Sequence, residues 1–157
     1  MSMEIQIFSD RRLISLTEWQ RAIELEKYPV RFSSDAQLAT IEGFIPAQLS
    51  GKDAGFECFN DNAAQAMKLL GNQNFGRHWK FALGLRWLGS RVEELLSAWM
   101  AATAYAAATN GIIFDHEEGK IFKPEQARDT VQKIERDIPV IAALEAEIEK
   151  RFRSGST

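Results

Sequence analysis

The sequence predicts an α+β fold, in which an antiparallel sheet with hairpins packs against a central alanine-rich helix and a C-terminal helical segment. Apolar residues occupy every second position from Trp79 to Trp87, which is the pattern of a half-buried strand. Short apolar runs flank glycine-containing turns within 43–60 and 112–122, as in β-hairpins. Residues 91–109 are apolar most of the way round a helix, which predicts burial on more than one side.

The size and composition of the chain suit one folded domain. It has 157 residues, of which 45% are apolar and 26% are charged, and its net charge is -3. These shares are typical of a globular protein. Roughly two-thirds of the unfolded surface can be buried at this length. We therefore expect a single domain over 1–153 and a frayed tail over 154–157.

The first elements can be read from alternation and from helix caps. Residues 3–8 alternate apolar and polar side chains, which predicts an opening strand. Ser15 precedes Glu18 by three positions, the spacing of a capping box, so we expect a helix over 16–26. Pro29 ends that helix, because the residue before a proline avoids the helical region.

A hairpin and a short helix are expected next. The hairpin covers 43–60, and glycines at both ends of its turn, 51–55, permit positive φ. Pro46 predicts that the first arm lies at a sheet edge or contains a bulge, since proline cannot donate to a ladder. Residues 61–70 read as a helix that is capped by its first or second residue.

The second half of the chain alternates helices and short strands. Asn110 and the glycine after it predict a left-handed cap for the central helix. Residues 112–114 and 120–122 read as two strands of a hairpin. A helix over 124–136 follows, and a proline then breaks or kinks it before a second amphipathic segment over 139–151.

Charge and composition argue against several kinds of partner. The mild negative charge provides no basic footprint for nucleic acid and no polybasic anchor for anionic lipid. The uncharged stretch 95–114 consists mostly of alanine and threonine, so it predicts a buried helix rather than a membrane span. Cys58 is the single cysteine, and the N-terminal residues lack the pattern of a signal peptide. We expect a cytoplasmic protein without a membrane partner.

No familiar motif for chemistry occurs in the sequence. It contains no phosphate-binding loop, nucleophile elbow, zinc-binding helix motif or dinucleotide fingerprint, and we expect no cofactor, no metal and no catalytic residue. Cys58 is expected to be a small buried hydrophobe. All four tryptophans fit apolar stripes and are expected in the core; they are Trp19, Trp79, Trp87 and Trp99.

One turn groups several titratable side chains: Asp115, His116, Glu117 and Glu118. Oxygen and nitrogen ligands stand side by side there, but adjacent side chains on a tight turn diverge, and a metal would need further ligands. An acidic cluster can complement a basic protein surface and speed association. We therefore take these four residues as the best candidate for a partner-binding patch.

The order of features resembles that of a known group of proteins. The segments that carry the resemblance are 41–46 (IEGFIP), 54–57 (AGFE), 110–115 (NGIIFD) and 118–120 (EGK). The likeness spans most of residues 1–130. It is to small, mostly uncharacterised bacterial proteins, some of which look like immunity proteins of polymorphic or contact-dependent toxin systems. The resemblance implies a cytosolic inhibitor that binds a secreted toxin, and it transfers no functional residue.

Three hypotheses about function follow. The first is a non-enzymatic binding protein that neutralises a cognate toxin by direct contact. The second is a small enzyme or ligand-binding protein whose site is assembled from distant residues, which requires at least three of six candidates to converge in one pocket. Those candidates are Glu57, Cys58, His78, Arg86, Asp115 and His116. The third is a structural subunit that forms a homodimer through the hairpin edge or the C-terminal helix.

Overall fold

The computed structural model confirms the α+β fold. It describes the backbone of residues 2–154, and the side chains of this range apart from 139–146 and 152–154. Three of the four residues expected to form a frayed tail, 155–157, lie outside the described residues.

Seven strands form one sheet in the order β2-β3-β4-β5-β1-β6-β7, and each neighbouring pair is antiparallel. The strands are β1 (Ser2–Ser9), β2 (Val30–Phe32), β3 (Glu42–Leu49), β4 (Lys52–Asp61), β5 (Phe81–Leu88), β6 (Ile112–Asp115) and β7 (Lys120–Phe122). The helices are α1 (Leu16–Leu25), α2 (Ala63–Leu69), α3 (Val92–Thr109) and α4 (Pro124–Ser154), and a 3₁₀ turn spans Leu38–Thr40. The first strand in the chain therefore lies in the interior of the sheet.

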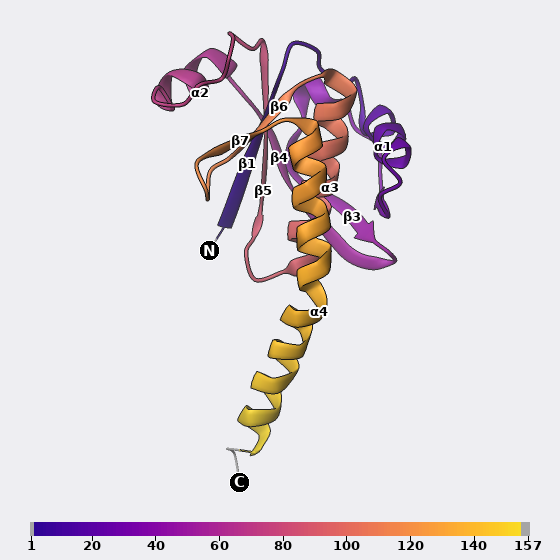
Figure 1. The fold of residues 1–157 in the computed structure, drawn as a ribbon. Helices are drawn as coiled ribbons and strands as arrows, with labels where there is room; N and C mark the ends of the chain where they lie inside the picture. The colour runs from indigo at the N-terminus through magenta and orange to yellow at the C-terminus, as the bar shows by residue number, and fades with distance from the viewer. Residues whose placement is uncertain (1, 155–157) are drawn as a thin grey trace.

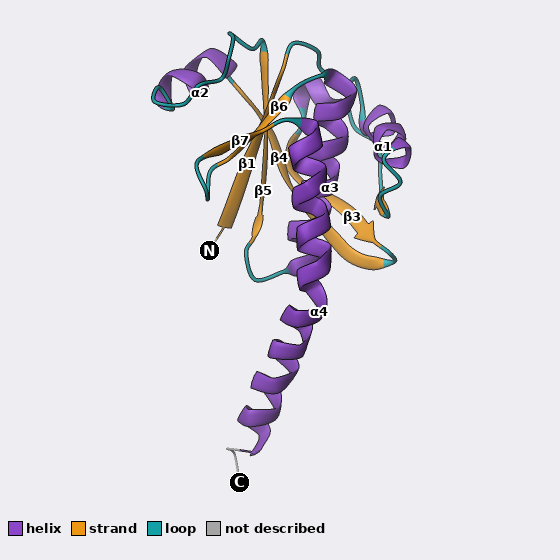
Figure 2. Ribbon diagram, viewed as in Figure 1, coloured by secondary structure: helices purple, strands orange, loops and turns teal. Residues whose placement is uncertain are grey.

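The helices are distributed unevenly over the two faces of the sheet (Figures 1 and 2). One face, which we call the helix face, is covered by α1, α3 and α4. On the opposite face, which we call the open face, α2 packs near one end of the strands. Figure 1 shows α4 running past the end of the sheet, so that its C-terminal part projects from the body of the molecule.

The main core lies between the sheet and α3. Thirteen of the eighteen residues of α3 are buried, which makes it the central helix that the alanine-rich stretch predicts. Ile5 and Ile7 of β1 point into this core, as the two-residue period of a strand requires. Trp19 joins α1 to α3, because its indole N–H donates to the Ala101 carbonyl at 2.8 Å.

Local signals explain where the helices begin and end. Ser15 caps α1 by accepting from the Glu18 amide at 3.2 Å, and the Glu18 carboxylate accepts from the Ile14 amide at 2.7 Å. These bonds satisfy amides at the start of the helix that have no partner within it. Asn110 ends α3 with a φ of 57°, in the left-handed region, as predicted.

Three local expectations are corrected by the structure. The helix does not break at Pro139 but continues from Pro124 to Ser154, because a proline removes a single backbone hydrogen bond, which a helix of 31 residues can tolerate. Strand β5 begins at Phe81 rather than Trp79, since the Lys80 amide donates to the Asp10 side chain at 3.2 Å.

The third correction concerns Pro46. Strand β3 is not an edge strand, because β2 pairs with it from Ala47 to Leu49. The ladder with β2 ends at Ala47, the residue that follows Pro46 in the sequence. The proline therefore lies just outside the ladder, where no backbone donor toward β2 is required.

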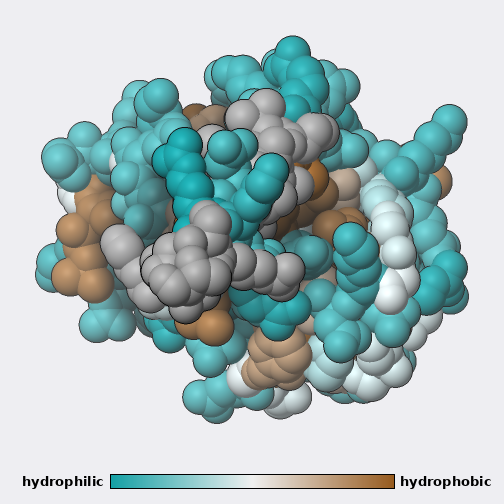
Figure 3. All heavy atoms as spheres, turned by 90° about the horizontal axis from the view of Figure 1, so that it is seen from below, coloured by the Kyte–Doolittle hydropathy of each residue, from teal (hydrophilic) through white to brown (hydrophobic). Residues whose placement is uncertain are grey.

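The surface is mixed in character. Among the described residues, none of the helices is both long and apolar enough to cross a bilayer. Figure 3 views the molecule from the end at which α4 projects, and it shows separate apolar patches between hydrophilic side chains rather than one continuous apolar area.

Candidate functional site

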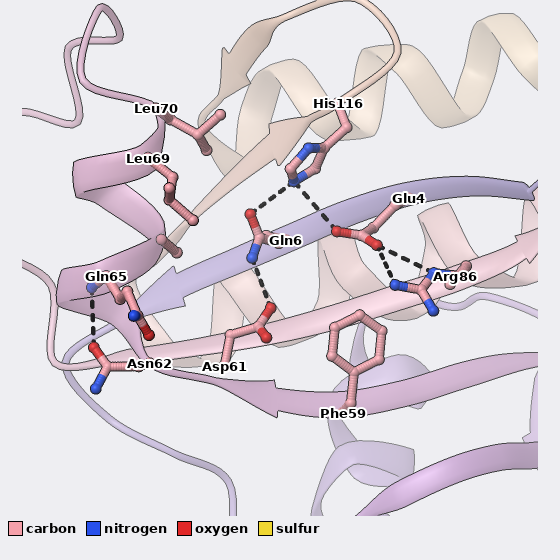
Figure 4. Close-up of a pocket in the computed structure, with 11 residues that line it drawn as sticks. Glu4, Gln6, Phe59, Asp61, Asn62, Gln65, Leu69, Leu70, Arg86 and His116 are labelled. Atoms are coloured by element: carbon pink, nitrogen blue, oxygen red, sulfur yellow. Dashed lines mark hydrogen bonds and ion pairs between the residues drawn. The ribbon is translucent and has the colours of Figure 1, made fainter.

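The strongest candidate site is a pocket on the open face, where α2 meets the middle of the sheet (Figure 4). Its volume is about 290 Å³. Strands β1, β4 and β5 form its floor, α2 forms one wall, and the residue after β6 enters from the other side. The lining residues are Glu4, Gln6, Phe59, Asp61, Asn62, Gln65, Ala66, Leu69, Leu70, Arg86 and His116.

Strand register explains why these side chains meet. Across β4, β5 and β1, three residues stand in one row, namely Glu57, Arg86 and Glu4. The next row along the strands contains Phe59, Gly84 and Gln6. Paired residues in an antiparallel sheet project from the same face, so both rows face the pocket side. The site is therefore assembled from three strands that are distant in sequence.

Gly84 makes room for an aromatic floor. A Cβ at this position would overlap the ring of Phe59, which lies over the glycine. The Arg86 guanidinium in turn stacks over the Phe59 ring, 4.8 Å from its centroid. Cation–π contacts of this kind hold the arginine side chain in place. The small residue on β5 thus fixes the position of both larger side chains.

A chain of polar contacts crosses the floor of the pocket (Figure 4). Arg86 donates to the Glu4 carboxylate through Nη2 at 2.8 Å and Nε at 3.2 Å. His116 Nε2 lies 3.4 Å from the other oxygen of Glu4 and 2.7 Å from Gln6 Oε1. Gln6 Nε2 donates to Asp61 Oδ2 at 2.7 Å. The chain therefore links Arg86 to Asp61 through three intervening side chains.

This hydrogen-bond network requires that Nε2 of His116 carries a hydrogen. An ionised carboxylate only accepts, so Gln6 must turn its NH₂ group to Asp61 and its oxygen to His116. The imidazole Nε2 must then carry a hydrogen and donate to that oxygen. The histidine consequently presents a donor, not a lone pair, to the floor of the pocket.

The pocket carries an excess of negative charge. Two carboxylates, Glu4 and Asp61, line it against one guanidinium from Arg86, and a third carboxylate, Glu57, contacts Arg86 from outside the lining. Glu57 lies at the edge, with its oxygen 3.7 Å from Arg86 Nη1. The hydrogen bonds that Arg86 donates to Glu4 raise the pKa of its guanidinium, so this group remains charged throughout the physiological range.

Exposed apolar side chains flank the charged floor. Leu69, in the pocket wall formed by α2, is 82% exposed. On the other side of Arg86, Phe44 and Leu88 are 56% and 53% exposed, and both border a second hollow of about 260 Å³. Since Arg86 lines both hollows, the two form one surface along the open face.

The residues of the predicted partner-binding turn have different surroundings. Asp115 is buried and accepts from the Glu117 amide at 2.9 Å, and burial raises the pKa of its carboxyl. Glu117 and Glu118 are exposed, and the Glu118 carboxylate lies 3.6 Å from the Lys120 ammonium. Only His116 among the four residues of this turn lines the pocket.

The six residues that we considered for an assembled site are only partly brought together. Arg86 and His116 line the same pocket, and Glu57 contacts Arg86 from its edge. Cys58 is fully buried on the helix face, where desolvation raises the pKa of its thiol. His78 is exposed in the connector before β5, and Asp115 is the buried residue described above.

Of the five side chains in the polar network, three escaped the sequence analysis, namely Glu4, Gln6 and Asp61. Polar side chains at alternate positions of a strand read as the solvated side, yet Gln6 is only 4% exposed. The sequence offered one weak signal: Glu4 and Gln6 share a strand face with the apolar residue Phe8, which the structure shows to be fully buried.

The donor set does not suggest a metal centre. Among the side chains that the structure describes, no group of three or more His, Cys, Asp or Glu residues is placed to hold a metal ion. Comparisons with known protein families, with curated proteins and with solved structures found no match. Function must therefore be argued from the geometry of the open face.

Proposed function

We propose that this chain is a non-enzymatic binding protein of the immunity type, which neutralises a cognate bacterial toxin in the cytoplasm by direct protein–protein contact. The observation that carries the proposal is the open face of the sheet. It places exposed apolar side chains, Leu69, Phe44 and Leu88, beside charges that are already held in position. The resemblance noted in the sequence supports a toxin as the partner.

A face of this composition suits docking to another protein. Apolar side chains rimmed by polar groups are typical of interaction surfaces. Here Glu4 and Arg86 hold each other, and His116 and Asp61 hold Gln6, so little side-chain freedom is lost when a partner covers them. The net acidity of the pocket suits a basic partner surface, which would speed encounter.

Binding and protection are tested together. We expect the chain to co-purify with the product of the adjacent gene and to protect cells when the two are co-expressed. A Leu88→Asp variant places a charge on the open face and should weaken both effects at least tenfold. Leu25→Asp is the control, because Leu25 is the same residue type, is even more exposed, and lies on α1, away from this face. Absence of binding and of protection would refute the proposal.

A second candidate is a protein that binds a small ligand. It is favoured by the convergence of Arg86 and His116 in one pocket with Glu57 at its edge. The discriminating measurement is a thermal-shift screen of small charged metabolites. Saturable stabilisation that disappears in Arg86→Gln, with no protection against a toxin, would favour this reading over the first.

A further inference from the structure

The carboxylate of Asp61 has an unusual position within the pocket on the open face. Its Oδ2 accepts from the neutral amide of Gln6 at 2.7 Å. Among the described residues, no Lys, Arg or His lies within ion-pair distance of it, whereas Glu4 and Glu57 share the guanidinium of Arg86. Arg86, in the same pocket, interacts with Asp61 only at longer range. The end of the pocket near α2 therefore holds a carboxylate that has no direct ion pair among the described residues.

The walls around this carboxylate are apolar. Phe59 lies on the floor, and Leu69 of α2 and Leu70, the C-cap residue of that helix, stand at the side (Figure 4). Arginine and lysine pack their aliphatic stems along apolar surface while their charged heads reach polar partners. A charged floor with an apolar wall is thus complementary to a long basic side chain. Gln65 adds an amide to the same wall.

The size of the pocket also limits the occupant. About 290 Å³ lies at the lower end of the range of ligand sites, which suits one inserted side chain better than a large molecule. The apolar residues outside the pocket, Phe44 and Leu88, provide contact area that a free amine would leave uncovered but a protein surface would cover.

We propose that this pocket receives one basic side chain, an arginine or a lysine, from the protein partner, and that Asp61 is the carboxylate that meets it. The inference rests on the proposed function, because it names the chemistry of the partner at that surface. The partner's basic residue would form the direct ion pair that Asp61 lacks and would lie against Phe59 and Leu69.

The pocket is tested first without any partner. The full chain, labelled with ¹⁵N, is titrated with the peptide acetyl-Gly-Arg-Gly-amide and, separately, with acetyl-Gly-Gln-Gly-amide. We expect the arginine peptide to shift the side-chain amide signals of Gln6 and Gln65 saturably, and the glutamine peptide to leave them in place. The shifts should weaken as salt is added, because the pocket is open to solvent.

Two variants with the same change of net charge distinguish the site from general acidity. Asp61→Asn keeps an oxygen for Gln6 and should weaken binding of the arginine peptide at least tenfold. Glu24→Gln removes an exposed carboxylate from α1 and should leave binding unchanged. Far-ultraviolet circular dichroism and thermal unfolding confirm that both variants fold. Equal effects of the two variants, or no shift at Gln6 and Gln65 in the unaltered chain, would overturn the inference.

Measuring toxin binding by the same variants then distinguishes failure of this inference from failure of the proposed function. If the partner binds and Asp61→Asn binds it as tightly as the unaltered chain, the inference fails while the proposed function stands. If no toxin is bound but the arginine peptide binds at Asp61, the proposed function fails and the pocket chemistry stands. Loss of toxin binding in Asp61→Asn, together with normal binding by Glu24→Gln, supports both.

Discussion

Glu4 and Arg86 face each other across β1 and β5, and their contact orders one side of the pocket. The Arg86 side chain is 43% exposed, so solvent screens the pair and limits its contribution to stability. A double-mutant cycle with Glu4→Gln and Arg86→Gln should give a coupling of about 0.5 to 1 kcal/mol in urea unfolding.

A second ion pair provides the comparison. Arg11 and Glu18 are 3.4 Å apart, and Arg11 is more exposed than Arg86, so their coupling should be the smaller. A larger coupling for Arg11 and Glu18 would show that the contact between Glu4 and Arg86 does not order the pocket floor.

Gly84 is the residue on which the aromatic floor depends. Gly84→Ala forces the Phe59 ring away and should lower the free energy of unfolding by about 1 to 3 kcal/mol. In a Phe59→Ala background the obstacle is absent, so the same change should cost less than about 0.5 kcal/mol. Chemical denaturation of the four proteins measures the cycle. Equal costs in both backgrounds would contradict the contact.

Asp115 predicts a dependence of stability on pH. Burial raises its carboxyl pKa in the folded chain, so the folded state keeps this proton to higher pH than the unfolded state. Between the two pKa values, stability from this group falls as pH rises. Asp115→Asn retains an acceptor for the Glu117 amide but does not titrate. Relative to the unaltered chain, the variant should therefore gain stability as pH rises from 3 to 7, and a constant difference would refute the cause.

The candidate site was only partly predictable from residues alone. Arg86 stood out as a charged residue within an apolar strand, and His116 as a titratable residue within an acidic turn. Gln6 and Asp61 did not, because their importance arises from contact with each other across strands far apart in sequence. A polar residue on a strand is solvated or buried according to which strand lies beside it, and one sequence does not specify that neighbour.

Among the elements, α3 depends on how it ends. Asn110 adopts positive φ, which costs an ordinary residue about 1 to 2 kcal/mol. Asn110→Ala should therefore lower thermal stability, whereas Asn110→Gly should not. Ala108→Gly is the control, because a glycine two residues earlier lies within the helix and should cost about 1 kcal/mol. If Asn110→Ala proves as stable as Asn110→Gly, the cap does not limit the helix end.

Elements whose sequence signals are local were predicted from the sequence. The hairpin of β3 and β4 was expected from its glycines, but its turn is Ser50 and Gly51 rather than 51–55, because 52–55 pair with β3. Helix α1 follows from Ser15 and Glu18. The continuity of α4 through Pro139 was not predicted, because a proline signals a missing hydrogen bond without showing whether the helix can tolerate its loss. The interior position of β1 was likewise invisible, since its partners lie far along the chain.

For the whole molecule, the oligomeric state tests the hypothesis that the chain is a structural subunit that forms a homodimer. Both edge strands, β2 and β7, have three residues, which limits edge-to-edge pairing. We expect a monomer in size-exclusion chromatography with light scattering. Should a dimer form through the projecting part of α4, Ile148→Glu would separate it, whereas Ile14→Glu, at an exposed residue before α1, would not. A dimer that resists Ile148→Glu would point to the sheet edges instead.

The interior position of β1 also has a kinetic consequence for synthesis. β1 emerges from the ribosome first, yet its partners are β5 and β6, and Ser9 pairs with Phe81. Contacts so distant in sequence close slowly. The hairpin of β3 and β4 can form before the partners of β1 have been synthesised. The apolar side chains of β1 therefore stay unpaired until β5 and β6 have been translated, and the yield of native protein depends on that interval as well as on final stability.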